Sequence, residues 1–228
     1  MVRWQAGLAP LALVLSVAPA AAQSPRDLIF QSAFGEQSQP VALERVRRAY
    51  ALASATAEHD PANEDAAVIA AAAQGYIAKL TGSRADALKA RRQFEATATR
   101  FPRNAEAQLG IGAWHLAVVN RVGRLVGAVV GASRGRGMAL LGRAVALGRS
   151  EAFVPGIAGM MLIEADPADA QGRAWVEAAA RAAAPSGPDR VIQRAAARIA
   201  ALLRAGNAKG AQQLADRSLP FGWFRRDD

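Results

Sequence analysis

The stretch EAFVPGIAGMMLIEADPADAQGRAWVEAAARAAA, residues 151–184, carries the pattern that decides the fold. Apolar residues recur through it at helical spacing. In its middle, Asp166 can act as an N-cap, Pro167 follows at a first helical position, and Asp169 stands behind them. The stretch therefore predicts two helices, 153–164 and 168–183. The turn between them is short, which favours an antiparallel pair.

The same signals recur along the rest of the chain. Val191, Ala195 and Ile199 show the helical spacing most clearly, and Asp60-Pro61 repeats the start signal of Asp166-Pro167. Only one short run, Leu125 to Val130, is rich in β-branched residues, and no alternating strands occur. The chain is predicted to be all-α, with helices near 41–58, 62–80, 84–100, 104–120, 136–148, 153–164, 168–183, 188–205 and 207–217.

Paired helices of this length invite a test for a repeat period near about 34 residues. A tetratricopeptide repeat has a small and then a large residue in its first helix. Its second helix has alanine, an aromatic residue or leucine, and a second alanine, and proline often closes the unit. The unit near Glu151 agrees at Gly159, Leu162, Trp175 and Ala178 and departs at Gln171. An earlier unit agrees at Ala90, Phe94 and Pro102, with Thr97 in place of alanine. A middle unit has Ala107, Gly112 and Trp114-His115, and then Gly137, Leu141 and Ala144 after an insertion.

The chain thus resembles a degenerate tetratricopeptide-like array over roughly residues 60–185. This resemblance implies antiparallel helical hairpins stacked on one another, with a concave or edge surface that binds peptides or proteins. Stacked hairpins bury one face and leave a second face free for partners. A helical bundle without repeats is the alternative.

The first residues read as a bacterial secretory signal. Arg3 precedes a short apolar run, and Ala20, Ala21 and Ala22 end it, so we expect cleavage after Ala22 and a periplasmic or secreted protein. The apolar run is shorter than the ~20 residues of a membrane span. We expect a signal peptide at 1–22, a flexible segment at 23–40, the helical domain at 41–217 and an aromatic, basic tail at 218–228.

Positive charge is concentrated in particular segments. The formal net charge is +9, and no acidic residue occurs between Ala107 and Ser150, where six arginines stand. Arg190, Arg194 and Arg198 form a second ridge at helical spacing. Such a ridge is a solvated face, or it meets the acidic side chains of a neighbouring helix or an anionic partner. Export favours lipid headgroups, glycans or acidic protein surfaces over nucleic acid. The candidate partner-binding residues are Arg121, Arg124, Arg134, Arg136, Arg190, Arg194, Arg198 and Trp223.

The segment VGRLVGAVVGASRGRG, residues 122–137, contains the pattern of a hydrolase nucleophile turn, with Ser133 at its centre. No histidine follows Ser133 to act as its base, and no parallel sheet is predicted to carry such a turn. Phosphate-binding loop patterns also fail at the residues that make the contacts. The segment is instead expected to be an insertion in the middle hairpin, either an interface or core packing. Its four-spaced glycines would allow close helix contact.

The acidic cluster, the histidine and the C-terminal aromatic residues are more simply explained as parts of the fold than as functional sites. The acidic cluster Glu58–Asp65 is expected to cap helices rather than hold a metal, and His115 is expected to be a satisfied core residue. With no cysteine, thiolate chemistry is excluded. Trp223 and its aromatic neighbours could pack on the last helix, or dock on a partner or a membrane interface.

These observations favour a non-catalytic, cofactor-free scaffold or adaptor in an envelope complex, of undetermined oligomeric state. The alternative is a small-ligand-binding accessory of a tripartite (TRAP-type) uptake system, similar to periplasmic helical-repeat proteins. That alternative requires a pocket between hairpins.

Overall fold

The computed structural model describes residues 23–224, and within that range it contains helices and no strand. The all-α prediction is confirmed. The predicted signal peptide, residues 1–22, and the last four residues lie outside the described part of the chain. The helices are α1 (Pro25–Phe34), α2 (Gln39–His59), α3 (Glu64–Thr81), α4 (Arg84–Arg100), α5 (Ala105–Val129), α6 (Arg134–Gly148), α7 (Phe153–Ala165), α8 (Ala170–Arg181), α9 (Gly187–Arg204) and α10 (Ala208–Ser218).

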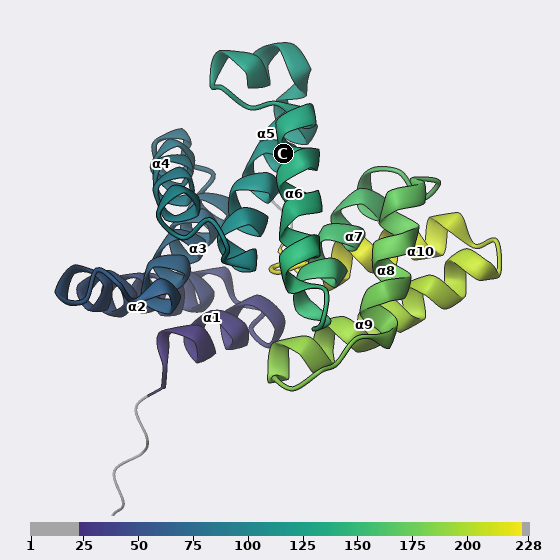
Figure 1. Ribbon diagram of the computed structural model, residues 1–228, viewed down its shortest axis with the longest axis horizontal. Coiled ribbons are helices and arrows are strands. Elements are labelled where there is room, and N and C mark those ends of the chain that lie inside the picture. The colour runs from purple at the N-terminus through teal and green to yellow at the C-terminus, as the bar shows by residue number, and fades with distance from the viewer. Residues whose placement is uncertain (1–22, 225–228) are drawn as a thin grey trace, which may run out of the picture.

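Each helix packs mainly against a helix adjacent to it along the chain, which gives stacked antiparallel pairs (Figure 1). Contacts two positions apart, such as α3 with α5 and α7 with α9, join neighbouring pairs. Helix α10 returns to contact α7. The arrangement is compatible with a helical-repeat fold, in which contacts are local along the chain.

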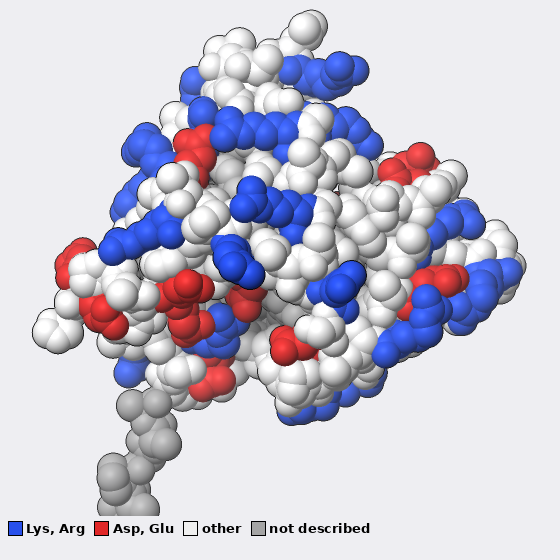
Figure 2. Space-filling view, viewed as in Figure 1, with Lys and Arg blue, Asp and Glu red and all other residues white. Residues whose placement is uncertain are grey.

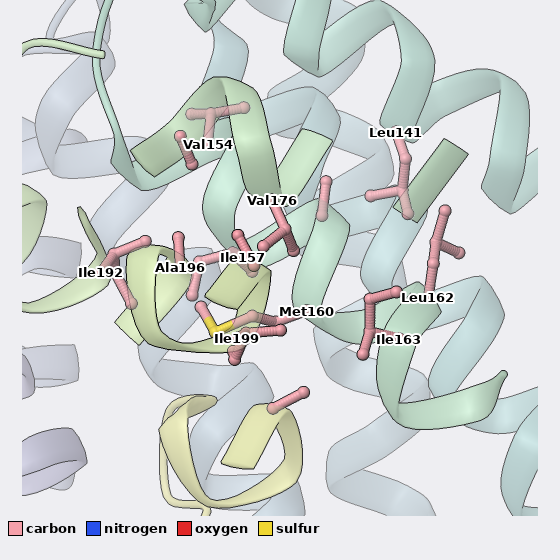
Figure 3. Close-up of a cluster of buried hydrophobic side chains, with 14 of the residues drawn as sticks. Leu141, Val154, Ile157, Met160, Leu162, Ile163, Val176, Ile192, Ala196 and Ile199 are labelled. Atoms are coloured by element: carbon pink, nitrogen blue, oxygen red, sulfur yellow. The ribbon is translucent and has the colours of Figure 1, made fainter. Parts of the chain in front are cut away.

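The hydrophobic core is divided along this stack. One cluster is centred on α7, where Ile157, Met160 and Ile163 meet Val176 of α8 and Ile199 of α9 (Figure 3). A second cluster joins α1, α2 and α3, and a third joins α3, α4 and α5. Each pair of helices therefore buries its apolar face against its neighbours, as stacked hairpins must.

The Asp-Pro signals mark turns, but the helix caps lie further along. Asp60 ends α2, and Asn63 caps α3 through a bond from the Ala66 amide. In the turn after α7, Asp169 rather than Asp166 accepts the amide of Gly172. The predicted N-caps at Asp60 and Asp166 were therefore wrong, because each of these aspartates accepts an amide two residues on and stabilises the turn itself.

Glycines allow the paired helices to approach closely. A Cβ added to Gly159 of α7 would lie 2.7 Å from the main-chain nitrogen of Val176 in α8. Gly172 of α8 faces Gly159, so both helices have a glycine at this contact. Gly172 stands next to Gln171, the position at which the repeat pattern failed. In the middle pair, Gly112 of α5 approaches Leu141 of α6 in the same manner.

The segment 23–40, expected to be flexible, instead contains α1 and the start of α2. Ser24 caps α1, and Leu28, Ile29 and Ala33 are buried against the N-terminal cluster. This expectation was wrong because the apolar residues of α1 are covered by α2, a long-range contact absent from the local pattern.

The aromatic side chains of the C-terminal tail pack in the cluster of α1, α2 and α3, whereas Gly222 lies close against the last turn of α10. Phe221 is fully buried, its ring lies 4.9 Å from that of Tyr76, and its amide donates to the Ala33 carbonyl. The Lys79 ammonium donates to the carbonyl of Pro220 at 2.7 Å. In Figure 1 the yellow C-terminal segment accordingly runs from α10 back toward the N-terminal helices. The tail thus joins the two ends of the helical stack.

Candidate functional site

The end of α5, the link that follows it and the first residues of α6 form a projection that we call the tip, residues 121–136. Helix α5 breaks at Gly123, which has the left-handed φ of 80°, and a further turn of helix runs to Val129. The chain reverses at Gly131, which also has a positive φ, before α6 begins. In Figure 1 the tip extends beyond the other helices at the top of the view. Residues other than glycine rarely adopt such backbone angles, so the two glycines shape the tip.

The base of the tip is attached to the body of the protein. Arg91 of α4 donates to the carbonyl of Val130 at 2.6 Å, and its guanidinium lies over the Trp114 ring. Ala132 is buried in the third cluster. Gly127 contacts Val119, an earlier residue of the same helix. These contacts hold the base in one orientation.

The outer part of the tip exposes large apolar side chains. Leu125 is 88% exposed and Val129 82%, and Val126 and Val122 are exposed by 57% and 42%. Four exposed arginines surround them: Arg121, Arg124, Arg134 and Arg136. Among the described residues, none of these arginines has a carboxylate within ion-pair distance. The tip therefore combines apolar surface with unneutralised positive charge.

The four-spaced glycines do not together mediate close helix packing as predicted; of the three, only Gly127 is buried, and a Cβ there would lie 3.4 Å from the Val119 side chain. A Cβ on Gly123 would meet nothing within 4 Å, and Gly131 serves a chain reversal. Close contact is made instead by Gly137, whose added Cβ would lie 2.9 Å from the Leu116 side chain. Gly137 therefore allows α6 to pack closely on α5.

The other predicted binding residues do not join the tip. Arg190, Arg194 and Arg198 are exposed on α9, which lies at the lower end of the molecule, away from the tip (Figure 1). Trp223 is partly buried against the N-terminal cluster, with its ring centroid 6.0 Å from that of Phe221. The eight residues thus form an exposed tip group, a separate α9 ridge and one tail residue that packs on the body.

A groove of about 550 Å³ lies where four separate segments meet. Its walls come from α1, the start of α5, the α6–α7 link and the α8–α9 link. Figure 2 shows the hollow in the lower centre of the molecule, with acidic side chains near it. The sequence patterns did not predict this groove, because its segments are far apart in the chain and no single motif carries them.

The groove combines carboxylates with aromatic surface. Arg26 forms ion pairs with Asp65 and with Glu106, the latter at 3.0 Å. Asp189 accepts the Phe153 amide at 2.9 Å and also the Ser186 hydroxyl, which ties the α8–α9 link to α7. Glu151 is exposed at the rim. The carboxylates outnumber the single arginine of the lining, in a chain that is otherwise strongly basic.

Phe30 and Phe153 give the groove its apolar walls, and both are partly buried. Leu147, 39% exposed, adds an aliphatic side chain. A lining that combines apolar walls with a few charged groups suits an extended segment or a small ligand.

His115 precedes Ser133 in the chain, whereas the base of a hydrolase follows its serine. The structure nevertheless places the two residues side by side. The contact joins the Ser133 main-chain amide to Nδ1 of His115 at 3.4 Å, whereas the Ser133 hydroxyl accepts the Arg136 amide and caps α6. The serine oxygen therefore acts as a helix cap in this arrangement. Within the described residues, no group of three or more histidine, cysteine, aspartate or glutamate side chains is placed to hold a metal ion.

His115 is fully buried as expected, but only one of its nitrogens has a partner. Among the described residues nothing bonds to Nε2. Burial lowers the pKa of His115, and the guanidinium groups of Arg136 and Arg91 lower it further. The unfolded chain therefore binds a proton at a pH where the folded chain does not, so this histidine makes the protein less stable as pH falls below about 6.5.

This shift predicts a measurable pH dependence. Between about pH 7.5 and about pH 5, the free energy of unfolding of a His115→Gln variant should fall less than that of the unsubstituted protein. Urea unfolding followed by circular dichroism at each pH measures the slope. Ala197→Gln, which changes an exposed side chain of α9 that carries no titratable group, is the control and should keep the original slope. Equal slopes for His115→Gln and the unsubstituted protein would contradict the assignment.

No single helix of the described chain reaches the length and apolarity of a membrane span. Only α5 and α6 taken together do, as a pair bent by 118°.

No protein-family model, curated protein or solved structure matches this chain.

Proposed function

We propose that the protein is a non-catalytic, periplasmic scaffold or adaptor that binds an extended segment of an envelope protein in the groove between its helical pairs. The observation that carries this proposal is the groove itself. It has about 550 Å³, the size of many ligand sites, and four parts of the chain converge on it. The stacked pairs also suit the concave binding surface that the tetratricopeptide-like resemblance implies.

The charge of the groove specifies the chemistry of the bound segment. Asp27, Glu106 and Glu151 stand in the lining, and Arg26 neutralises only part of their charge. Phe30 and Phe153 offer apolar surface beside them. A segment with a lysine or arginine next to an apolar side chain is complementary to both features. Complementary charge directs a partner to the groove, and the apolar contact contributes most of the affinity.

A second candidate is binding of a small molecule by an accessory protein of a tripartite uptake system. The same groove supports it, because that function requires a pocket between hairpins, and this one lies between the ends of several helices. A ligand that suits this lining would carry positive charge and an apolar part.

Site-specific photocrosslinking in the native host tests the adaptor function. A photoreactive amino acid at Leu147, in the groove, should give a protein-sized adduct, and the same amino acid at the exposed Ala197 of α9 should not. Introducing Glu151→Lys should lower the yield at Leu147 about fivefold, because one charge pair at a surface is worth about 1 kcal/mol. The helical content of each variant is measured by circular dichroism.

The outcomes separate the two candidates. Equal yields at Leu147 and Ala197, or a yield that Glu151→Lys does not change, would contradict the adaptor proposal. Native mass spectrometry of the purified protein tests the second candidate. A small molecule retained under gentle conditions, lost on denaturation and absent from Glu151→Lys would assign the groove to that ligand.

A further inference from the structure

We propose that the tip docks the protein on an anionic phospholipid surface, with Leu125, Val126 and Val129 inserted among the headgroups and the surrounding arginines bound to lipid phosphates. This inference concerns a different part of the molecule from the groove and does not depend on the proposed adaptor function.

The shape of the tip favours a fluid surface. Leu125 and Val129 are 88% and 82% exposed and stand four residues apart, on one side of the short helical turn after Gly123. The part of the chain that carries them projects beyond the other helices (Figure 1). Contiguous exposed apolar surface of this kind marks an interaction site. A protein partner would need a cavity that matches the projection, whereas mobile lipid headgroups can rearrange around it.

The composition of the tip supports the same conclusion. Residues 121–136 contain no tryptophan, tyrosine or phenylalanine. Tryptophan, tyrosine and arginine dominate the energetically important positions of protein interfaces. Leucine and other apolar side chains beside arginines are a combination by which helices lie in the interface of anionic membranes.

The arginines add a requirement for a negatively charged partner. Arg134 and Arg136 stand in the first turn of α6, where a positive charge is unfavourable because the helix dipole is positive there. Arg121 and Arg124 stand on the other side of the apolar residues, and no acidic residue occurs from Ala107 to Ser150. Figure 2 shows positive side chains around the apolar end of the molecule. Arg134 and Arg136 therefore do not stabilise α6, and all four arginines attract phosphate groups.

A second copy of the chain is a poorer occupant. In a twofold contact through the tips, each arginine group would face the identical group of the other copy. Like charges brought together at an interface oppose association. An anionic membrane offers apolar interior and negative charge at once, which matches both properties of the tip.

The conformation of the tip is also fixed before it meets a membrane. The bond from Arg91 to the Val130 carbonyl and the bond from the Ser133 amide to His115 fix its base. The break at Gly123 turns the apolar side chains outward. Docking would therefore order few additional residues, which favours binding.

The absence of cysteine allows a site-specific test with the full chain. We would label a Leu125→Cys variant with an environment-sensitive fluorophore and add vesicles of equal parts phosphatidylglycerol and phosphatidylcholine. The emission should shift to shorter wavelength, and vesicles of phosphatidylcholine alone should give a much smaller shift. The same label at Ala197→Cys, exposed on α9, is the positional control and should not shift.

Vesicle sedimentation then measures how much the arginines and the apolar side chains of the tip each contribute to membrane binding. Arg121→Gln and Arg124→Gln should each lower partitioning into the phosphatidylglycerol vesicles about fivefold. Leu125→Asp combined with Val129→Asp should lower it at least tenfold while leaving the thermal unfolding curve unchanged, since both side chains are exposed. Replacing Arg190, Arg194 and Arg198 together with glutamine removes more charge from a different surface and should change partitioning by less than twofold. Every variant keeps residues 1–22, so any contribution from them is the same throughout.

Three results would overturn the proposal. The label at residue 125 could show no shift with phosphatidylglycerol vesicles, or the aspartate pair could partition as well as the unsubstituted protein. The label at residue 125 could also shift without lipid, in proportion to protein concentration, which would assign the tip to self-association.

Discussion

Replacing Phe221 with alanine should lower the free energy of unfolding by about 3–5 kcal/mol, the usual cost of removing a buried phenylalanine ring. Phe221 is fully buried among residues of α1, α2 and α3 and packs beside Tyr76. Its backbone also has a positive φ of 57°, which a residue other than glycine adopts only when its contacts compensate. Alanine would keep that backbone strain and lose the ring contacts. Urea unfolding followed by circular dichroism measures the loss.

A neighbouring aromatic residue supplies the control for this experiment. Phe224 is only partly buried at the edge of the same cluster, so Phe224→Ala should cost clearly less than Phe221→Ala. A loss below about 1 kcal/mol for Phe221→Ala would show that the tail does not hold the two ends of the stack together.

The second large effect is expected at Gly159, where alanine should destabilise the protein by about 1–3 kcal/mol. A Cβ there would lie 2.7 Å from the main-chain nitrogen of Val176 and 3.0 Å from the Gly172 carbonyl oxygen. Neither atom can move without shifting helix α8. The steric cost therefore exceeds the gain in helix propensity that alanine normally brings.

The same substitution at Gly142 should have the opposite sign. Gly142 lies inside α6, and an added Cβ would meet nothing within 4 Å. Gly142→Ala should therefore raise the free energy of unfolding by about 0.5–1 kcal/mol. Thermal or urea unfolding of the two variants side by side gives the comparison. Two changes of the same sign would contradict close packing of α7 on α8.

The groove and the tip require partners of opposite charge. The groove has carboxylates and suits a positively charged segment, whereas the tip has arginines and suits a negatively charged surface. A protein with both could hold an envelope partner while resting on a membrane. Loss of one activity without the other, in the Glu151 and Leu125 variants, would show that the two surfaces act independently.

The sequence by itself determined the class of fold and the positions of most helices. Helical spacing of apolar residues is a local signal, and the structure confirms the helices that it predicted near 84–100 and 188–205. The arginine-rich character of the tip was also predicted from the chain alone, because charge is a property of the residues themselves. The predicted caps at Asp60 and Asp166 failed by a few residues, since a turn and a cap use the same residue types.

Only the tertiary structure decided which surfaces are formed. The groove needs α1, α5 and two distant links to meet, and Phe221 needs α1 and α3 to cover it. Whether Leu125 faces solvent depends on the break at Gly123 and on the bond from Arg91, a residue of another helix. Local signals describe how a segment folds, whereas burial and exposure depend on contacts between segments far apart in the chain. Those contacts placed the tail on the body, left the tip uncovered and opened the groove.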